Sequence, residues 1–187
     1  MNAAELGRHY LDDVAVTFRK QKKLAEQALA QVDDAAFFRA LDAESNSLAL
    51  IVKHVAGNQR SRWRDFLTSD GEKPDRHRDT EFEAAGEDTR ATLMARWEEG
   101  WRFLFDALAG LAPEDLLREV RIRGEAHTVL QAIERQLVHY GQHVGQIVFL
   151  AKHWAGAEWK SLSIPRGKSA EYLAAHGVAV HRPKEGG

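Results

Sequence analysis

Residues 128–156 read TVLQAIERQLVHYGQHVGQIVFLAKHWAG, and this stretch decides the fold class. Its apolar residues recur at three- or four-residue steps from Ile133 to Ala151, which is typical of an amphipathic helix. Thr128 and Gln131 have the spacing of a capping box, in which each side chain accepts a hydrogen bond from the other residue's backbone N–H. The stretch therefore predicts a long helix that begins at this box.

Three further segments show the same helical periodicity. They cover about residues 3–31, about residues 47–68, and a segment that opens at Asp88 or Thr89. No strand-like alternation of useful length is present, although residues 120–125 fit a brief extended piece or hairpin. Four long amphipathic helices with one long crossover predict an all-α fold, a four-helix bundle with short extra helical turns.

The connections and the tail complete the predicted organisation. Residues 69–88 form a long charged crossover, and Phe82 is its expected anchor to the core. A weak helical turn is expected near residues 169–176. We expect a single domain over residues 1–180, followed by a flexible tail at 181–187.

The composition excludes several classes of function. The chain has 187 residues and no cysteine, so it forms no disulfide, no thiolate metal site and no cysteine nucleophile. Its 26 Lys and Arg against 28 Asp and Glu give a formal net charge of −2, without the basic excess typical of nucleic-acid binding. The most apolar stretch, residues 137–154, is interrupted by polar side chains, which argues against a membrane span. With no signal-peptide pattern at the start, a cytoplasmic protein is expected.

His139 and His143 are the first candidate site residues. They are four residues apart on the predicted fourth helix, so both imidazoles lie on one face and can share a metal ion. Gln136 makes this face unusually polar. Gly141 and Gly145 each cost about 1 kcal/mol within a helix, which suggests the close approach of a neighbouring element.

His54 is the candidate third ligand. It lies on the apolar side of the predicted second helix, three residues after Ile51 and four before Asn58. A buried neutral imidazole needs a polar partner, and a divalent metal supplies one. The alternative interpretation is a core histidine bonded to a backbone carbonyl or to Asn58.

Two other sets of residues have structural and functional interpretations. Trp63, Trp97 and Trp101 have helical spacing and are predicted core residues, with an aromatic ligand wall as the alternative. The arginines near residues 60–64 and 76–78 fit a solvated helix face and a loop balanced by acidic neighbours, with anion binding as the alternative.

Two stretches resemble the DinB-like superfamily of bacterial metal-binding four-helix bundles. They are VKHVAGN at 52–58 and HYGQHVGQI at 139–147, and the resemblance extends over about residues 5–175. The stretches SRWRDFLTSDGEKP at 61–74 and SIPRGKS at 163–169 are similar to one largely uncharacterised branch. The resemblance implies that His54, His139 and His143 hold zinc or nickel, and that the protein is a homodimer.

The resemblance also implies a reaction class. Characterised members include thiol-dependent transferases and an isomerase, so we expect a metal-dependent enzyme of the transferase or hydrolase type acting on a small molecule. Three imidazoles leave a coordination position open, at which a metal activates a low-molecular-weight thiol or water. Any thiol must come from outside the chain. Asn58 and Gln136 are candidate supporting donors near the metal.

The alternative is a non-catalytic, metal-stabilised helical bundle that acts as a structural or interaction module. A structural site normally has four protein ligands. Asp13 on the first helix is the candidate fourth ligand on this interpretation.

Overall fold

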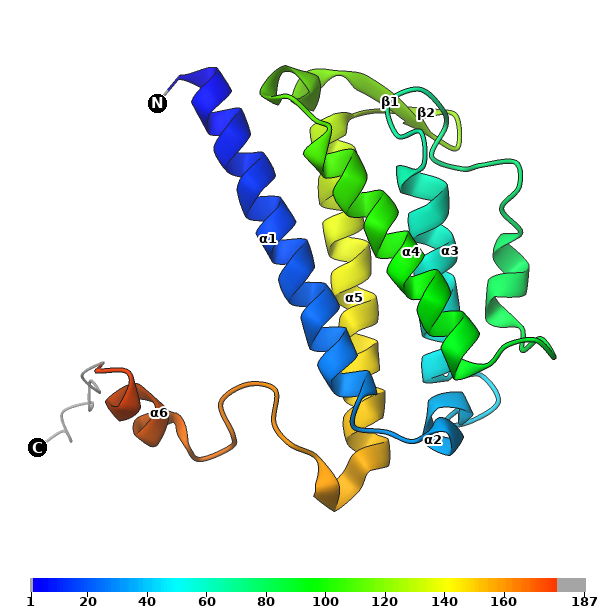
Figure 1. The fold of residues 1–187 in the computed structure, drawn as a ribbon, viewed down its shortest axis with the longest axis vertical. Helices are drawn as coiled ribbons and strands as arrows, with labels where there is room; N and C mark the ends of the chain where they lie inside the picture. The colour runs from blue at the N-terminus through cyan, green and yellow to red at the C-terminus, as the bar shows by residue number, and fades with distance from the viewer. Residues whose placement is uncertain (1, 178–187) are drawn as a thin grey trace, which may run out of the picture.

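The computed structural model describes residues 2–177 and is mainly α-helical, with one two-stranded sheet. Figure 1 shows the long helices running lengthwise beside one another, with the β-hairpin across one end. The described helices are α1 (Ala3–Leu29), α2 (Asp34–Phe38), α3 (Leu48–Trp63), α4 (Arg90–Ala109), α5 (Val129–Ala155) and α6 (Ser169–Ala175). The strands are β1 (Glu119–Ile122) and β2 (Glu125–Thr128), and the 3-10 turns are η1 (Arg78–Phe82), η2 (Pro113–Leu117) and η3 (Gly156–Glu158).

Side-chain caps set where the long helices begin. The predicted capping box of α5 is present, because Thr128 accepts from the N–H of Gln131 and Gln131 accepts from that of Thr128. Ser47 caps α3, and Thr89 rather than Asp88 caps α4. Each cap satisfies backbone N–H groups that lack a partner within the helix.

The helix in the second segment is shorter than predicted. The expected helix over about residues 47–68 ends instead at Trp63, and Asp65 has a φ of 51°. This left-handed conformation turns the chain out of the helix. Phe66 and Leu67, which the periodicity assigned to the helix, pack against the core from the turn that follows.

The core lies where the long helices meet. Phe18 of α1 is fully buried, and its ring centroid lies 6.0 Å from that of Tyr140, 6.3 Å from that of Trp63 and 6.4 Å from that of Trp101. The predicted core residues Trp63, Trp97 and Trp101 are all buried. α3 packs most extensively against α4, and α1 packs against α5.

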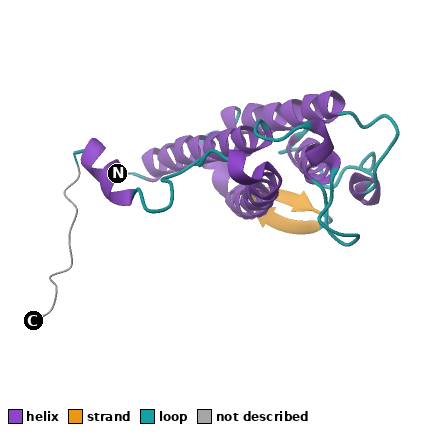
Figure 2. Ribbon diagram, turned by 90° about the horizontal axis from the view of Figure 1, so that it is seen from below, coloured by secondary structure: helices purple, strands orange, loops and turns teal. Residues whose placement is uncertain are grey.

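The connection from α3 to α4, residues 64–89, is more ordered than a plain loop. Within it η1 packs against α3 (Figure 1), and Asp70 joins the connection to the hairpin turn. The Asp70 carboxylate accepts hydrogen bonds from the backbone N–H groups of Arg123 at 2.8 Å and Gly124 at 2.7 Å. The hairpin pairs Glu119 with Thr128 and is seen beside the helices in Figure 2.

The C-terminal part of the chain leaves the helices. Figures 1 and 2 both show α6 set apart from the long helices. Its residues, Ser169–Ala175, agree with the weak helical turn expected near residues 169–176. The tail predicted at 181–187 lies outside the described residues. Among the described helices, none combines the length and hydropathy that a membrane span requires.

Candidate metal centre

Three histidines from two helices converge at one point. The Nε2 atom of His139 lies 3.3 Å from Nε2 of His54 and 3.2 Å from Nε2 of His143. One ring nitrogen of each residue lies within 4.8 Å of the others. Two nitrogen ligands of a tetrahedral zinc ion lie roughly 3.3 Å apart, given Zn–N bonds of about 2.0–2.1 Å. The spacing of the cluster therefore suits a shared divalent cation.

The helices explain this convergence. His139 and His143 are one turn apart on α5, and His54 faces them from the buried side of α3, where the residue is 4% exposed. The structure thus brings together all three histidines that the sequence singled out.

Hydrogen bonds set the tautomers of two of the rings. Nδ1 of His54 lies 2.8 Å from Oε2 of Glu81, and Nδ1 of His143 lies 2.8 Å from Oε1 of Gln146. Because these oxygens are acceptors, both Nδ1 atoms carry the proton and both Nε2 atoms keep their lone pair for a cation. Nδ1 of His139 is buried without a partner among the described residues.

Burial keeps the imidazoles of α5 neutral. It is the main cause that lowers the pKa of His139 to about 3, and the neighbouring rings of His143 and His54 act in the same direction. Burial also lowers the pKa of His143, despite a hydrogen bond that acts to raise it. Neutral imidazole is the form that binds a metal.

Glu81 is the residue that sequence reasoning missed. It is buried beside His54, and Arg76 binds both of its oxygens, with Nε 2.8 Å from Oε1 and Nη2 2.9 Å from Oε2. Burial alone would raise the pKa of Glu81, but hydrogen bonds from His54 and Arg76 lower it overall, so the carboxylate is ionised. The sequence feature that could have indicated Glu81 is its neighbour Phe82, the predicted anchor of the connection. The ring centroid of Phe82 lies 4.7 Å from that of His54.

The expected solvated arginines are partly buried. Arg62 is 5% exposed, and its guanidinium donates to the carbonyl of Gly71 and to Glu72. The side chain of Arg76 is 4% exposed and also contacts Glu72. The expectation of a solvated helix face was therefore wrong for Arg62. Arg76 was expected in a loop balanced by Asp75 and Asp79, but it pairs with Glu72 and Glu81 instead.

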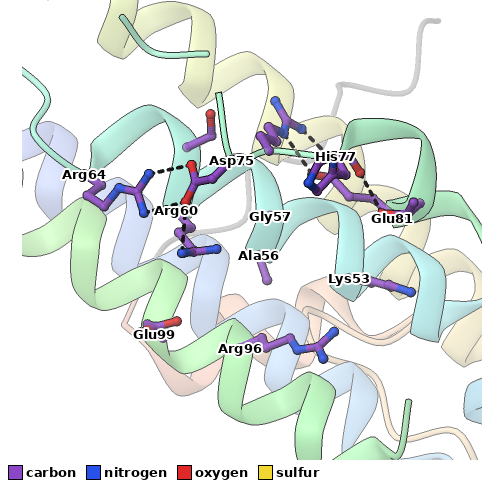
Figure 3. A pocket seen from close by; sticks show the side chains of 13 residues that line it. Lys53, Ala56, Gly57, Arg60, Arg64, Asp75, His77, Glu81, Arg96 and Glu99 are labelled. Carbon is purple, nitrogen blue, oxygen red and sulfur yellow. Dashed lines mark hydrogen bonds and ion pairs between the residues drawn. The ribbon is translucent and has the colours of Figure 1, made fainter. Parts of the chain in front are cut away.

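The expected solvated helix face holds for Arg60, which is exposed, and the expected balance of the loop holds for Arg78, which pairs with Asp79. Asp75, the other expected balancing acid, pairs with Arg60 and Arg64. Both donate to Asp75, at 3.2 Å for Arg60 and at 2.6 and 3.0 Å for Arg64. Figure 3 shows these pairs at a pocket of about 460 Å³ lined by residues of α3, α4 and the connection. Glu81 also lines this pocket, so the carboxylate that orients His54 lies between it and the histidines.

The two candidate supporting residues, Asn58 and Gln136, have different surroundings in the structure. Asn58 is buried, but its Oδ1 accepts from the hydroxyl of Tyr140 at 2.9 Å, and that hydroxyl accepts from Nε1 of Trp63 at 3.0 Å. The partner of His54 is therefore Glu81, and neither of the alternatives, a backbone carbonyl or Asn58, takes that role. Gln136 is buried and lines a second pocket beside His54.

Two other expectations need correction. Asp13 lies exposed on α1 and is absent from the cluster found among the described residues, so it does not complete a four-ligand site. The expected close approach applies to Gly141, where an added Cβ would lie 3.3 Å from Nε2 of Gln21. It fails for Gly145, where an added Cβ would meet nothing within 4 Å.

Comparison with known proteins yields one family. A family model described as "Protein of unknown function (DUF1572)" matches residues 5–168, a range that contains the three histidines and Glu81. Searches of curated proteins and of solved structures return no significant match.

Proposed function

Because the chain belongs to the DUF1572 family of proteins of unknown function, we propose its function from the site itself. In this proposal the protein binds one divalent metal, zinc or nickel, through His54, His139 and His143, and is a metal-dependent enzyme. Its four long helices form a bundle of the DinB-like type in this proposal. A homodimer belongs to the same proposal, and sedimentation analysis tests it.

The observation that carries the proposal is the convergence of three Nε2 atoms. Two of them are left as acceptors by the hydrogen bonds of Glu81 and Gln146. Lone pairs at 3.2–3.3 Å repel unless a proton or a cation lies between them. A proton on Nε2 of His139 can be donated to only one neighbouring Nε2 at a time, whereas one metal ion can bind all three Nε2 atoms.

An enzyme is favoured over a structural module by the number of ligands. Among the described residues the cluster contains three ligand side chains, and a structural site normally has four. An open coordination position is the mark of catalytic sites. A zinc or nickel ion bound there would act as a Lewis acid and lower the pKa of a thiol or of water.

The residues of the chain have distinct roles in this proposal. The three imidazoles hold the cation, and Glu81 keeps His54 in the correct tautomer and orientation. The chain has no cysteine, so the nucleophile is a low-molecular-weight thiol or water. The proposed reaction is therefore a thiol-dependent transfer or a hydrolysis.

Elemental analysis of protein purified without an affinity tag tests the proposal. We expect about one zinc or nickel per chain in the wild type and in His153→Ala, since His153 is exposed on α5 outside the cluster. The His139→Ala variant is expected to lose the metal. Metal retained in that variant, or absent from the wild type after reconstitution, would overturn the proposal.

A further inference from the structure

A second pocket lies beside the histidines and is lined by arginines. Its volume is about 260 Å³, and His54 and His139 form part of its wall. Its lining contains no carboxylate and includes five arginines, Arg62, Arg76, Arg78, Arg123 and Arg135. We call this the arginine pocket.

Carboxylates around the arginine pocket do not neutralise it. Glu72 receives ion pairs from Arg62, Arg76 and Arg123, and Glu81 receives a further one from Arg76. Arg78 pairs with Asp79 at 3.8 Å, and the Asp79 side chain is 98% exposed. These three carboxylates and that of Asp70, which lies close to Arg62, carry four negative charges against five guanidinium groups, which leaves a surplus of one positive charge.

Two donors in the arginine pocket lack acceptors. Arg135 forms no ion pair or hydrogen bond with the described residues. Arg62 is 5% exposed, and its Nε–H is buried without an acceptor in the same part of the chain. A buried N–H group normally has an acceptor, and an oxyanion bound in the arginine pocket would supply one.

The inner arginines are held in place before any ligand arrives. Arg62 comes from α3, Arg76 from the connection and Arg123 from the hairpin turn, and Glu72 binds all three. Asp70 fixes the hairpin turn through the backbone N–H of Arg123. Such preorganisation lowers the entropic cost of binding.

We infer that the arginine pocket binds the carboxylate or phosphate group of a small substrate or co-substrate and places the rest of that molecule against the histidine cluster. Guanidinium groups bind these oxyanions through paired N–H donors. The pocket is below the roughly 300–1,000 Å³ of sites for drug-sized ligands, so the occupant is a small molecule or a small part of one. The placement against a metal rests on the proposed function, whereas anion binding does not.

Calorimetric titration of metal-free protein at low salt tests the anion site. The probes are inorganic phosphate, malonate, and malonamide as a neutral analogue of malonate. The test variant is Arg78→Gln with Arg135→Gln, whose side chains have few partners to lose, and the control is Arg60→Gln, which pairs with Asp75 outside the arginine pocket.

We expect phosphate or malonate to bind the wild type and the control equally, and malonamide not to bind. The double variant is expected to bind at least about tenfold more weakly, since a hydrogen bond to a charged group contributes about 1.5–3 kcal/mol. Preference for phosphate or for malonate identifies which oxyanion the arginine pocket accepts. Equal affinity in the double variant, or no anion binding by the wild type, would overturn the inference.

Metal content measured on the purified protein, before the metal is removed for calorimetry, separates this inference from the proposed function. Stoichiometric metal without anion binding rejects the arginine pocket as an anion site and leaves the metal centre standing. Anion binding without metal in any preparation supports the anion site and rejects the metal centre, together with the placement of a substrate against it.

Discussion

Gly57 of α3 lies directly against the carboxylate of Glu81. A Cβ added at position 57 would be 2.8 Å from Cδ of Glu81, closer than Cβ atoms come in real structures. Arg76 binds both oxygens of Glu81 and restrains it from moving aside. The missing side chain at position 57 thus determines how close Glu81 comes to α3 and to His54.

The Gly57→Ala substitution is expected to weaken metal binding. The added methyl group displaces Glu81 from Nδ1 of His54, and loss of such a supporting partner typically costs about 10–100-fold in metal affinity. Chelator competition for zinc measures the change. Gly145→Ala is the matched control, because its added Cβ meets nothing within 4 Å. Equal zinc affinity in Gly57→Ala and Gly145→Ala would show that Glu81 does not support the site.

The Glu81→Gln substitution is expected to destabilise the metal-free protein by about 3 kcal/mol, because it breaks a buried ion pair and leaves Arg76 undercompensated. The pKa of Glu81 is lower in the folded state than its ordinary value of 4.5. Its stabilising contribution is therefore complete above that value and is lost as the pH falls through the lower, folded pKa.

Urea unfolding at a series of pH values tests this dependence. The difference in unfolding free energy between wild type and Glu81→Gln should be constant near neutral pH and shrink below pH 4.5. A difference that does not change with pH would mean that the charge of Glu81 contributes nothing to stability.

Zinc is expected to raise the melting temperature of the wild type by roughly 5–10 °C at a free concentration of about 100 times Kd. The His143→Ala variant should show no such shift, since it removes one of the three converging nitrogens. His153→Ala, an exposed histidine on the same helix, should retain it. Differential scanning calorimetry provides the measurement, and a full shift in His143→Ala would remove that residue from the ligand set.

The Asp70→Ala substitution is expected to loosen the hairpin turn. Its carboxylate accepts backbone N–H groups of Glu72, Arg123 and Gly124, and loss of such charged hydrogen bonds costs about 1–3 kcal/mol. Hydrogen exchange at the amides of Arg123 and Gly124 should become faster. Asp79→Ala removes the same charge from an exposed position and should leave exchange unchanged. Unaltered protection in Asp70→Ala would refute the anchoring role.

The long helices and the pair formed by His139 and His143 follow from local patterns. The box formed by Thr128 and Gln131 acts within one turn, and the spacing of His139 and His143 along one helix suffices to place both rings on one face. His54 was identified as a candidate ligand because it is a polar residue on an otherwise apolar helix face. Local rules are sufficient for the caps and for the pair on α5, because those groups are close in sequence. His54 lies 85 residues before His139, and its place in the cluster was implied by the family resemblance.

Glu81 and Arg62 were beyond sequence reasoning for a physical reason. Glu81 contacts His54 across 27 residues, from a short 3-10 turn with no repeating pattern that would indicate its orientation. Arg62 is buried because Gly71 and Glu72 fold back over it after the helix ends at Trp63. The periodicity of the segment continued past that point and concealed the turn.

The hydroxyl of Tyr140 has a consequence for the ion selectivity of the proposed metal centre. It joins α5 to Asn58 and Trp63 on α3, directly beside His139, and it is fully buried. Since His139 and His143 are fixed relative to each other on one helix, the remaining variable of the cluster is the gap between α5 and α3. The hydrogen bonds of the Tyr140 hydroxyl hold that gap. In the proposed metal centre the packing of the core would therefore set the ionic radius of the bound cation, and repacking the core would change this radius without altering an imidazole.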